Sequence, residues 1–267
     1  MGNNKKNLLL QAGDKLKLKP RLATVAKLIP PGKVVVDIGS DHGCLPAYLV
    51  MENISSLVVA TDKSKVCLEK ARQLLELFNL SSQVKLRWGD GLQALKCEDR
   101  PEVVVIAGMG ASSIMRILQR DKSMLSPVKC LVLQPMGEEY LLRRWLITQE
   151  WYFSEEKLAY ERGHYYQIIK AMPGKSSYIE PFQLEIGPKI IENKDPLLAP
   201  YLECKIDYFR SIVMDLENKT SGRARKRYRF FQEKIKRFEE VLAIAGKDRE
   251  CNATHGPVGT SIPGHGR

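Results

Sequence analysis

The sequence predicts an α/β fold, a doubly wound and mostly parallel sheet, followed by a separate α-helical coiled-coil segment. Two observations predict it. Up to about residue 171, short apolar runs alternate with stretches of helical periodicity, which is typical of repeated βα units. Beyond residue 201, apolar side chains recur at alternating spacings of three and four residues, which is typical of coiled coils. The 267 residues, 44% of them hydrophobic, exclude a wholly disordered chain.

The βα repeat begins with the strand expected at 34–39, which opens with three consecutive valines, as a strand buried on both faces should. The helix expected at 64–78 has apolar residues at helical spacing, so one face should pack on the sheet. The turn at 161–163 predicts a closing antiparallel hairpin. The other expected strands are 57–61, 84–86, 103–107, 130–133, 152–160 and 164–171, and the other expected helices are 111–120 and 138–149.

The domain organisation follows from these changes of pattern. Residues 1–172 form the expected sheet domain, with a basic helix at its start. Residues 173–200 are rich in proline and are expected to form a connector, and residues 201–247 are expected to form a coiled-coil hairpin. Residues 248–267 contain glycines and prolines without an apolar period, so we expect a disordered tail.

The helical segment contains two heptad seams that are out of register with each other. Because Ser221 and Gly222 can turn the chain between them, we expect an antiparallel hairpin of two helices rather than one long kinked helix. The first seam comprises Leu202, Ile206, Phe209, Val213 and Leu216, and the second comprises Tyr228, Phe231, Ile235, Phe238 and Leu242.

The net charge of +11 lies at two regions of the chain. Residues 1–36 carry +7 and residues 201–247 carry +5, whereas residues 37–200 carry −1. A neutral body with two basic flanks fits a protein that holds a polyanion, although exposed helices also carry such charge for solubility.

Neither a membrane span nor a metal site is predicted. The longest uncharged apolar-rich stretch, 103–115, is too short to cross a bilayer, and the first residues do not resemble a signal peptide. The six cysteines lack the paired spacing of zinc ligands, which fits a reducing compartment. We therefore expect a cytoplasmic protein without a bound metal.

Ligands of open α/β sheets bind at the carboxyl ends of the strands, which directs attention to the loop that begins at Asp37. This loop lacks the second and third glycines of the dinucleotide-binding pattern, and the carboxylates of Asp37 and Asp41 would repel a pyrophosphate. A cationic ligand suits it better, and S-adenosylmethionine, with its ammonium and sulfonium groups, is such a ligand. The alternative role of Asp41 is to cap the following helix.

Three further strand ends carry acidic residues or glycines. Asp62 can accept hydrogen bonds from ribose hydroxyls or cap a helix. Asp90, between two glycines, can approach an adenine amino group or belong to a simple turn. The small residues around Met109 leave room for a methyl group and an adenine, although a methionine also serves as core filler. The cofactor-binding residues predicted in this way are Asp37, Gly39, Ser40, Asp41, Asp62, Lys63, Asp90, Gly91, Ala107, Gly108 and Met109.

These residues lie in longer segments that resemble the bacterial tRNA (adenine(22)-N1)-methyltransferase family. The resemblance spans about residues 15–245, and its most specific elements are DIGSDH at 37–42, IAGMG at 106–110 and LQP at 133–135. Such proteins combine a class I, Rossmann-like methyltransferase domain with a coiled-coil domain, in agreement with the fold expected above. The resemblance also includes RLATVAKLIP at 21–30, RWGDGL at 87–92, GHYYQI at 163–168 and IGP at 186–188.

The resemblance implies methyl transfer from S-adenosylmethionine to N1 of adenine 22, in the D-arm region of tRNA. N1 lies on the Watson–Crick edge, so the adenine must be exposed before it reacts. Because neutral adenine already carries a lone pair on N1, alignment matters more than a strong base. The product is cationic, and Asp41 or the Gly108 carbonyl can stabilise it. His42 is the other catalytic candidate, with hydrogen-bonded packing as its alternative role.

The expected partner is tRNA, held by the two basic flanks. A monomer is favoured, although a heptad seam can pair between chains as well as within one, so the sequence leaves the oligomeric state open. Arg21 either contacts a phosphate or braces the neighbouring loop, and Tyr228 either stacks on a base or packs in its heptad seam. The predicted RNA-binding residues are Lys17, Lys19, Arg21, Arg223, Arg225, Lys226, Arg227 and Arg229.

The chain departs from the family pattern at Gly43, Ala111 and Met136, where the family usually has Ala, Gly and Asn. If that asparagine helps to hold the target base, its role is open in this chain. The alternatives are a methyltransferase with another substrate, such as another RNA, and an inactive RNA-binding protein with the same fold. A third alternative, an NAD-dependent oxidoreductase, is disfavoured by the missing glycines.

Overall fold

The computed structural model describes residues 16–219 and 221–253. The chain divides into two compact units, Met1–Ile190 and Ile191–Arg267, and each is described separately below. Residues 1–15, which belong to the predicted basic flank, lie outside the described residues.

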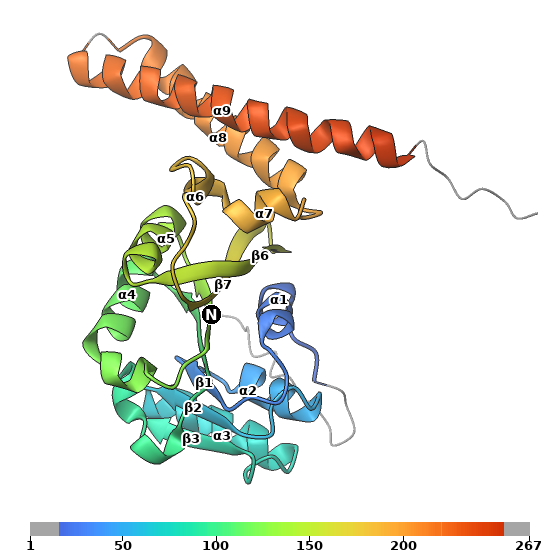
Figure 1. The fold of residues 1–267 in the computed structure, drawn as a ribbon, viewed down its shortest axis with the longest axis vertical. Coiled ribbons are helices and arrows are strands. Elements are labelled where there is room, and N and C mark those ends of the chain that lie inside the picture. Colours follow the sequence, from blue (N-terminus) through green and yellow to red (C-terminus); the bar gives the residue numbers. More distant parts are fainter. Residues whose placement is uncertain (1–15, 220, 254–267) are drawn as a thin grey trace, which may run out of the picture. The chain divides into compact units, whose positions relative to one another are not determined.

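A seven-stranded sheet forms the centre of the first unit (Figure 1). The strand order is β3-β2-β1-β4-β5-β7-β6, and β7 runs antiparallel to both of its neighbours. The order of the strands reverses between β1 and β4, so the switch point of the sheet lies between these two strands. The strands are β1 (Val35–Ile38), β2 (Val58–Asp62), β3 (Val84–Trp88), β4 (Val103–Met109), β5 (Cys130–Pro135), β6 (Trp151–Glu161) and β7 (His164–Pro173).

Helices cover both faces of this sheet and bury two separate cores (Figure 1). Val35 belongs to the core under α1, α2 and α3, whereas the next residue, Val36, belongs to the core under α4 and α5, as the alternation of a strand requires. The helices of this unit are α1 (Pro20–Leu28), α2 (Cys44–Met51), α3 (Lys65–Leu77), α4 (Ala111–Arg120), α5 (Glu139–Thr148), α6 (Gln183–Ile186) and α7 (Pro188–Glu192), with 3-10 turns η1 (Gly91–Ala94), η2 (Cys97–Asp99) and η3 (Lys122–Leu125).

The predicted doubly wound sheet with an antiparallel end is thereby confirmed, and every expected strand is present. The expected helix at 64–78 is α3, and the Oγ of its N-cap residue Ser64 accepts a hydrogen bond from the Cys67 backbone N–H at 3.2 Å. The range 173–200, expected as a connector, contains α6, α7 and the start of α8.

A buried ion pair holds the segment around α6 and α7 to the sheet. The Arg143 Nε lies 2.6 Å from the Glu156 Oε1, and both side chains are fully buried. The other Glu156 oxygen accepts a hydrogen bond from the Lys189 backbone N–H at 2.9 Å, and the Arg143 Nη1 donates to the Leu184 carbonyl at 2.9 Å. The pair therefore ties α5 and β6 to residues 184–189.

Gly187 is required at this contact. Its φ is +113°, and a Cβ there would lie 2.8 Å from the Arg143 Nη2 and 2.7 Å from the Ile190 Cδ1. Any side chain would both strain the backbone and displace the guanidinium. The IGP segment at 186–188 is thus explained by packing against the buried arginine.

The second unit contains two long helices, α8 (Leu198–Glu217) and α9 (Gly222–Ala253), which run antiparallel (Figure 1). The predicted break falls between them, so the single kinked helix is excluded. Phe209 of the first seam packs against Phe231 and Phe238 of the second, with ring centroids 5.6 Å and 5.3 Å apart. Across the same pair of helices, the Arg210 Nη2 lies 2.8 Å from the Glu239 Oε1.

The expected start of the disordered tail needs a correction. Helix α9 does not end near Leu242, its last apolar heptad position, but continues to Ala253. Residues 248–253 are therefore helical, and residues 254–267 lie outside the described residues. Within the described ranges, no helix is long and apolar enough to cross a membrane.

We predict that Glu156→Gln destabilises the protein by about 3–5 kcal/mol, because it leaves the Arg143 guanidinium buried without a counter-charge. Urea unfolding of the full chain measures this. The matched control is Glu98→Gln, which removes a carboxylate from the exposed Lys96–Glu98 pair and should cost about 1 kcal/mol or less. Equal losses in the two variants would contradict the structural role of the buried pair.

Candidate functional site

The loop that follows β1 is fixed by the end of β2. The backbone N–H groups of Gly39 and Ser40 both donate to the Thr61 carbonyl, at 2.8 Å and 3.1 Å. Asp41 and Gly43 have positive φ values of 52° and 72°, so the chain makes a tight left-handed turn before α2. Gly43 is the N-cap of α2, and no side chain caps this helix end, so Asp41 does not take the alternative role of a helix cap.

Asp37 is buried at the end of this first strand, with 4% of its surface exposed. Burial, together with a smaller contribution from the neighbouring charge of Asp62, raises the pKa of its carboxyl group to about 7. The ionised form of Asp37 therefore lacks solvation, and a cationic group placed next to it would be strongly favoured.

The Asp62 carboxylate joins two loops at the carboxyl ends of the parallel strands, which are called the strand-edge site below. Its Oδ2 accepts a hydrogen bond from the Asp41 backbone N–H at 3.0 Å, and its Oδ1 accepts one from the Ser64 N–H at 2.8 Å. Ser64, rather than Asp62, caps α3. Each carboxylate oxygen can accept a second hydrogen bond, so these contacts orient Asp62 and leave it able to bind hydroxyl groups.

Asp90, in the loop that follows β3, forms an ion pair with Arg120. The Arg120 Nη1 donates to the Asp90 Oδ2 at 2.9 Å, and the Arg120 Nη2 donates to the Asp90 carbonyl at 2.6 Å. The hydrogen bond from Arg120 lowers the pKa of Asp90. Gly91, with φ +67°, packs against Ile117 of α4, so both residues are held by the same helix.

Trp88 lies at the same strand end and is 63% exposed. Its indole N–H donates to the Lys63 carbonyl at 3.0 Å, and the Lys65 ammonium lies 4.8 Å from the ring centroid. The exposed side chain of Lys63 therefore belongs to the same rim as Asp62 and Asp90.

The end of β4 closes over the first loop through Met109. A Cβ on Gly39, which has φ +74°, would lie only 2.2 Å from the Met109 Cε. The positive φ favours glycine here, and any side chain at this position would also displace the end of the Met109 side chain. The register of β4 and β5 shifts between Ala107 and Met109, and the Gly108 φ of +80° turns the chain there.

The Gln134 side chain, fully buried at the end of β5, holds this turn in place. Its Oε1 accepts the Gly108 backbone N–H at 3.0 Å and also the Arg21 Nη1, while its Nε2 donates to the Pro135 carbonyl. The Arg21 guanidinium also lies over the Tyr166 ring, 5.7 Å from its centroid. Of the two roles predicted for Arg21, these contacts favour bracing of the Gly108 loop.

Other predicted residues lie at the exposed rim. The His42 Nε2 is 3.5 Å from the Asp41 Oδ2, and both side chains are at least half exposed. Lys17 and Lys19 are exposed just before α1. Within the described ranges, no group of three or more His, Cys, Asp or Glu side chains is arranged to hold a metal ion.

Comparison with known proteins decides the family. A family model described as tRNA (adenine(22)-N(1))-methyltransferase matches residues 35–240. The chain belongs to this family. The match confirms the resemblance predicted from the DIGSDH, IAGMG and LQP segments.

Individual members of the tRNA (adenine(22)-N1)-methyltransferase family are similar to this chain over most of its length. A Bacillus subtilis protein of that name is 31% identical over 204 residues, which cover 74% of this chain and 85% of the relative. The crystal structure of the B. subtilis m1A22 tRNA methyltransferase matches with a TM-score of 0.75 and 27% identity, over 85% of this chain and 100% of that structure. A Mycoplasma capricolum homologue, solved with S-adenosyl-homocysteine, matches with a TM-score of 0.73 and 29% identity, over 85% and 99% of the two chains.

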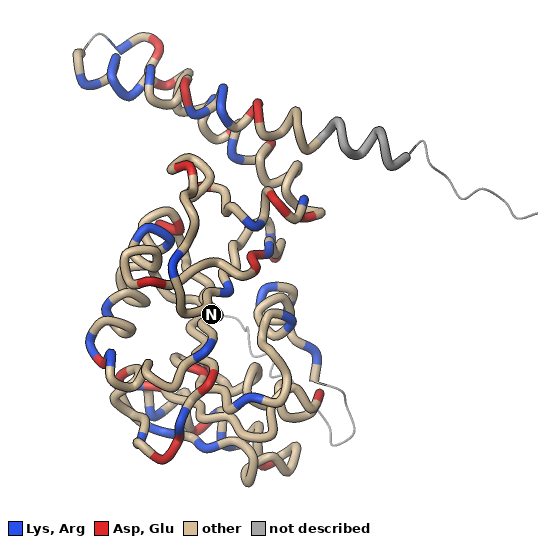
Figure 2. Tube along the Cα trace, viewed as in Figure 1, with Lys and Arg blue, Asp and Glu red and all other residues tan. Residues whose placement is uncertain are grey.

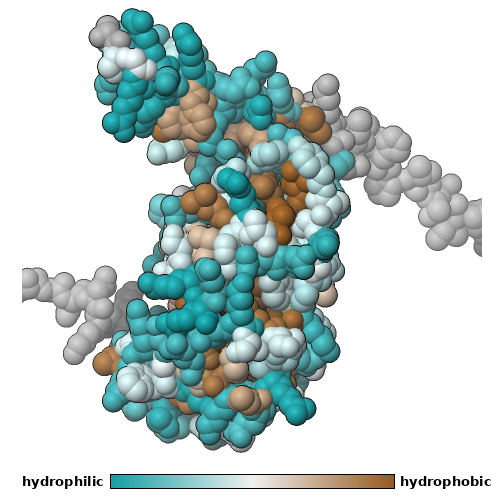
Figure 3. Space-filling view, turned by 60° about the vertical axis from the view of Figure 1, so that its left-hand side comes forward, coloured by the Kyte–Doolittle hydropathy of each residue, from teal (hydrophilic) through white to brown (hydrophobic). Residues whose placement is uncertain are grey.

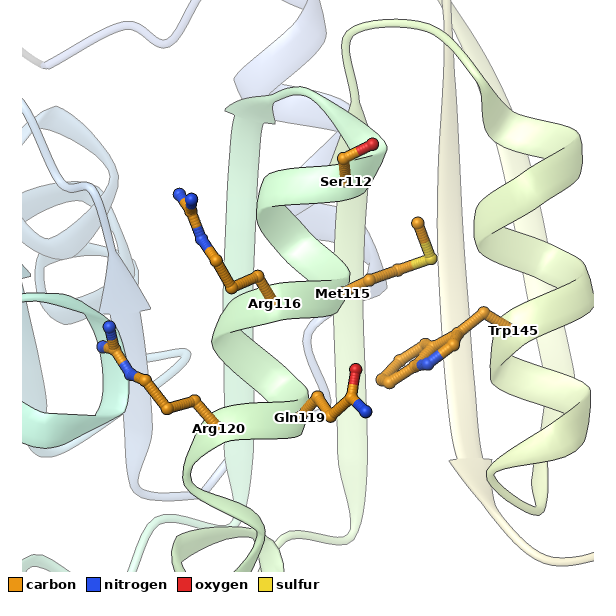
Figure 4. Close-up of a pocket in the computed structure, with 6 residues that line it drawn as sticks. All are labelled: Ser112, Met115, Arg116, Gln119, Arg120 and Trp145. Carbon is orange, nitrogen blue, oxygen red and sulfur yellow. The ribbon is translucent and has the colours of Figure 1, made fainter.

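This family member also has an open groove between α4 and α5 (Figure 4). The groove, of about 490 Å³, lies beside the strand-edge site, and Arg120 links the two because it also binds Asp90. Figure 4 shows the Trp145 ring of α5 facing the α4 residues. The lining residues are Ser112, Met115, Arg116, Gln119, Arg120 and Trp145.

Five predicted RNA-binding residues lie near the start of α9, where Figure 2 shows Lys and Arg gathered towards the turn between α8 and α9. All five side chains, Arg223, Arg225, Lys226, Arg227 and Arg229, are exposed. Tyr228 is half-buried, and its hydroxyl oxygen accepts a hydrogen bond from the Gln232 Nε2 at 2.8 Å.

Sequence reasoning missed three contributors to the site of this methyltransferase family member. They are Gln134 as a buried acceptor, Arg120 as the partner of Asp90, and Glu161, whose Oε2 accepts the Arg21 backbone N–H at 3.0 Å. Gln134 lies within the LQP motif, which was the available signal. The pairings with Arg120 and Glu161 join residues 30 and 140 positions apart, and no local pattern indicates them.

We predict that Asp37→Asn stabilises the ligand-free protein at alkaline pH. Because the folded-state pKa is raised, the native protein binds more protons than the unfolded chain between about pH 4 and 7, so this group's contribution to stability falls across that window as pH rises. The variant should gain up to about 4 kcal/mol over the parent at pH 8 and little at pH 4. Thermal unfolding at both pH values measures it.

The control for this prediction is Glu76→Gln, which changes an exposed carboxylate on α3. It should follow the parent's pH course. A stability difference between Asp37→Asn and the parent that is the same at pH 4 and pH 8 would contradict the raised pKa.

Proposed function

We propose that this chain transfers a methyl group from S-adenosylmethionine to N1 of adenine 22 in tRNA. The family match over residues 35–240 is the observation that carries the proposal. The strand-edge site supports it, because its carboxylates suit a cationic ligand and its first loop lacks the glycines that a pyrophosphate requires.

The residues present fit S-adenosylmethionine. The buried Asp37 carboxylate would favour the ligand's cationic groups, the Asp62 oxygens can accept the ribose hydroxyls, and Asp90 with Gly91 can receive the adenine. The remaining groups proposed to line the site are Gly39, Ser40, Asp41, Lys63, Ala107, Gly108 and Met109. S-adenosylmethionine supplies a methyl group on a sulfonium, whose C–S bond breaks as the new N–C bond forms.

The chain's own residues chiefly orient the adenine and stabilise the positive charge that develops on it. Adenine N1 supplies the electron pair, so the protein needs no strong base, and the positive charge that develops on the ring calls for nearby oxygen acceptors. Asp41 and the Gly108 carbonyl are the proposed acceptors, and His42 is the second catalytic candidate. Gln134 keeps the Gly108 turn in place, and Arg21 keeps Gln134 in place.

The target base would lie next to Met136, which is 54% exposed and whose backbone N–H donates to the Met109 carbonyl at 2.9 Å. Its thioether cannot donate a hydrogen bond to the base as an asparagine would. The base would therefore be held by packing on Met136 and by backbone groups.

The exposed basic residues support tRNA as the partner. Lys17, Lys19 and the five cations of α9 are proposed to attract the phosphate backbone, which positions an RNA without reading its sequence. We also propose that the protein acts as a monomer in the cytoplasm.

We predict that the purified protein forms N1-methyladenosine in unmodified tRNA transcripts when S-adenosylmethionine is supplied. Nucleoside mass spectrometry measures the product, and a transcript in which adenine 22 is replaced by guanine is the control that should stay unmethylated. Methylation at another base or in another RNA would move the proposal to a different substrate.

Binding of tRNA and S-adenosylmethionine without any methylated nucleoside would instead favour a non-catalytic RNA-binding protein. A Met136→Asn variant would then be assayed in the same way. Recovery of methylation in that variant would assign the loss to this single position.

A further inference from the structure

A second cavity lies in the helical unit, between the end of α8 and the start of α9. It is open to solvent and has a volume of about 470 Å³, within the range of small-ligand sites. It lies at the end of the hairpin that carries the turn, where the surface is mainly hydrophilic (Figure 3). The lining residues are Leu216, Glu217, Asn218, Lys219, Arg225, Tyr228 and Arg229.

Three cations face one carboxylate in this cavity. Lys219, Arg225 and Arg229 outnumber Glu217, so the lining has a net charge of +2. Two other cations of these helices are held in ion pairs, Arg210 with Glu239 and Arg237 with Glu233. Among the described residues, no ion pair within 4.0 Å involves the three cavity cations, so their charge is available to a ligand.

Helical geometry separates these residues from the rest of the basic run. Arg225 and Arg229 are one turn apart on the same face of α9, and Tyr228 lies beside Arg225 on that face. Lys226 and Arg227 are rotated by about 100° and 200° from Arg225, and they are not part of the lining. The basic run thus has one face that lines a cavity and another face that does not.

The first turn of α9 does not itself supply the anion site. The Ala224 N–H donates to the Ser221 Oγ at 3.2 Å, and the Arg225 N–H donates to the Ser221 carbonyl at 3.0 Å. These two N–H groups are already used, so the proposed anion site relies on side chains. Two guanidinium groups and an ammonium group are the side chains best suited to a phosphate.

We propose that this cavity binds one backbone phosphate of tRNA between Lys219, Arg225 and Arg229, with the adjoining nucleoside against the Tyr228 ring. This inference rests on the proposed function, because it takes tRNA as the substrate. It replaces a diffuse basic surface with a specific subsite. Lys226 and Arg227 then contribute only to the general attraction between the helix and the RNA.

Two double variants test this subsite, Arg225→Ala/Arg229→Ala and the matched control Lys226→Ala/Arg227→Ala. Each removes two exposed charges from the same turns of α9. The first should raise the Kd for tRNA by about tenfold or more and flatten its salt dependence by about one phosphate contact. The control should weaken binding by a few-fold at most. Circular dichroism checks that both variants keep their helices.

A variant that should tighten binding complements these losses. Glu217→Gln removes the one carboxylate from the cavity, so it should lower the Kd for tRNA by roughly two- to fivefold. Glu240→Gln, at an exposed position outside the cavity, is its control and should bind as the parent does. Tyr228→Phe keeps the ring and should retain the parent's affinity.

The outcomes separate this inference from the proposed function. Equal weakening by the two double variants, or no effect of Glu217→Gln, would overturn the subsite and leave a diffuse basic surface. If the parent binds tRNA but does not methylate it, the proposed function fails and the binding comparison still decides the subsite. If the parent does not bind tRNA at all, both are overturned.

Discussion

The hydrogen bonds of the buried Gln134 amide are the contacts on which the geometry of the strand-edge site depends. One side-chain oxygen receives the backbone N–H of Gly108 and the guanidinium of Arg21, so it joins β4, β5 and α1 at a single point. The turn at Gly108 in turn places Met109 against Gly39 of the first loop. Because a buried amide must satisfy its donors and acceptors within the protein, few arrangements of these three elements are compatible with it.

Carboxylates organise the other half of the site, and they differ in environment. Asp62 is satisfied by two backbone N–H groups, and Asp90 by an arginine, whereas Asp37 is buried with a raised pKa. A carboxylate kept in such a place destabilises the folded chain unless a cation neutralises it. This is the expected condition of a binding site whose ligand contributes the missing charge, and it connects local instability with ligand recognition.

The sequence predicted the sheet and its strand ends because periodicity and buried valine runs are local signals. The resemblance carried the family, and Asp37, Asp62 and Asp90 do lie at the carboxyl ends of the neighbouring parallel strands β1, β2 and β3. The parts that could not be predicted depend on contacts between distant residues. Burial of Arg143 on an apparently amphipathic helix required knowledge of Glu156 and Leu184, and the helical content of residues 183–192 was hidden by Gly187 and Pro188.

The exposed Trp88 has a spectroscopic consequence. The chain has three tryptophans, of which Trp151 is buried in the core beside β7 and Trp145 lines the α4–α5 groove. Trp88 alone among them stands at the strand edge, where its indole N–H is bonded to the Lys63 carbonyl between the Asp62 and Asp90 loops. Its emission should therefore respond to changes in polarity at this rim, while the buried ring of Trp151 supplies a largely constant background. The protein thus contains an intrinsic fluorophore next to its proposed ligand site, so occupancy of that site can be followed optically without a label.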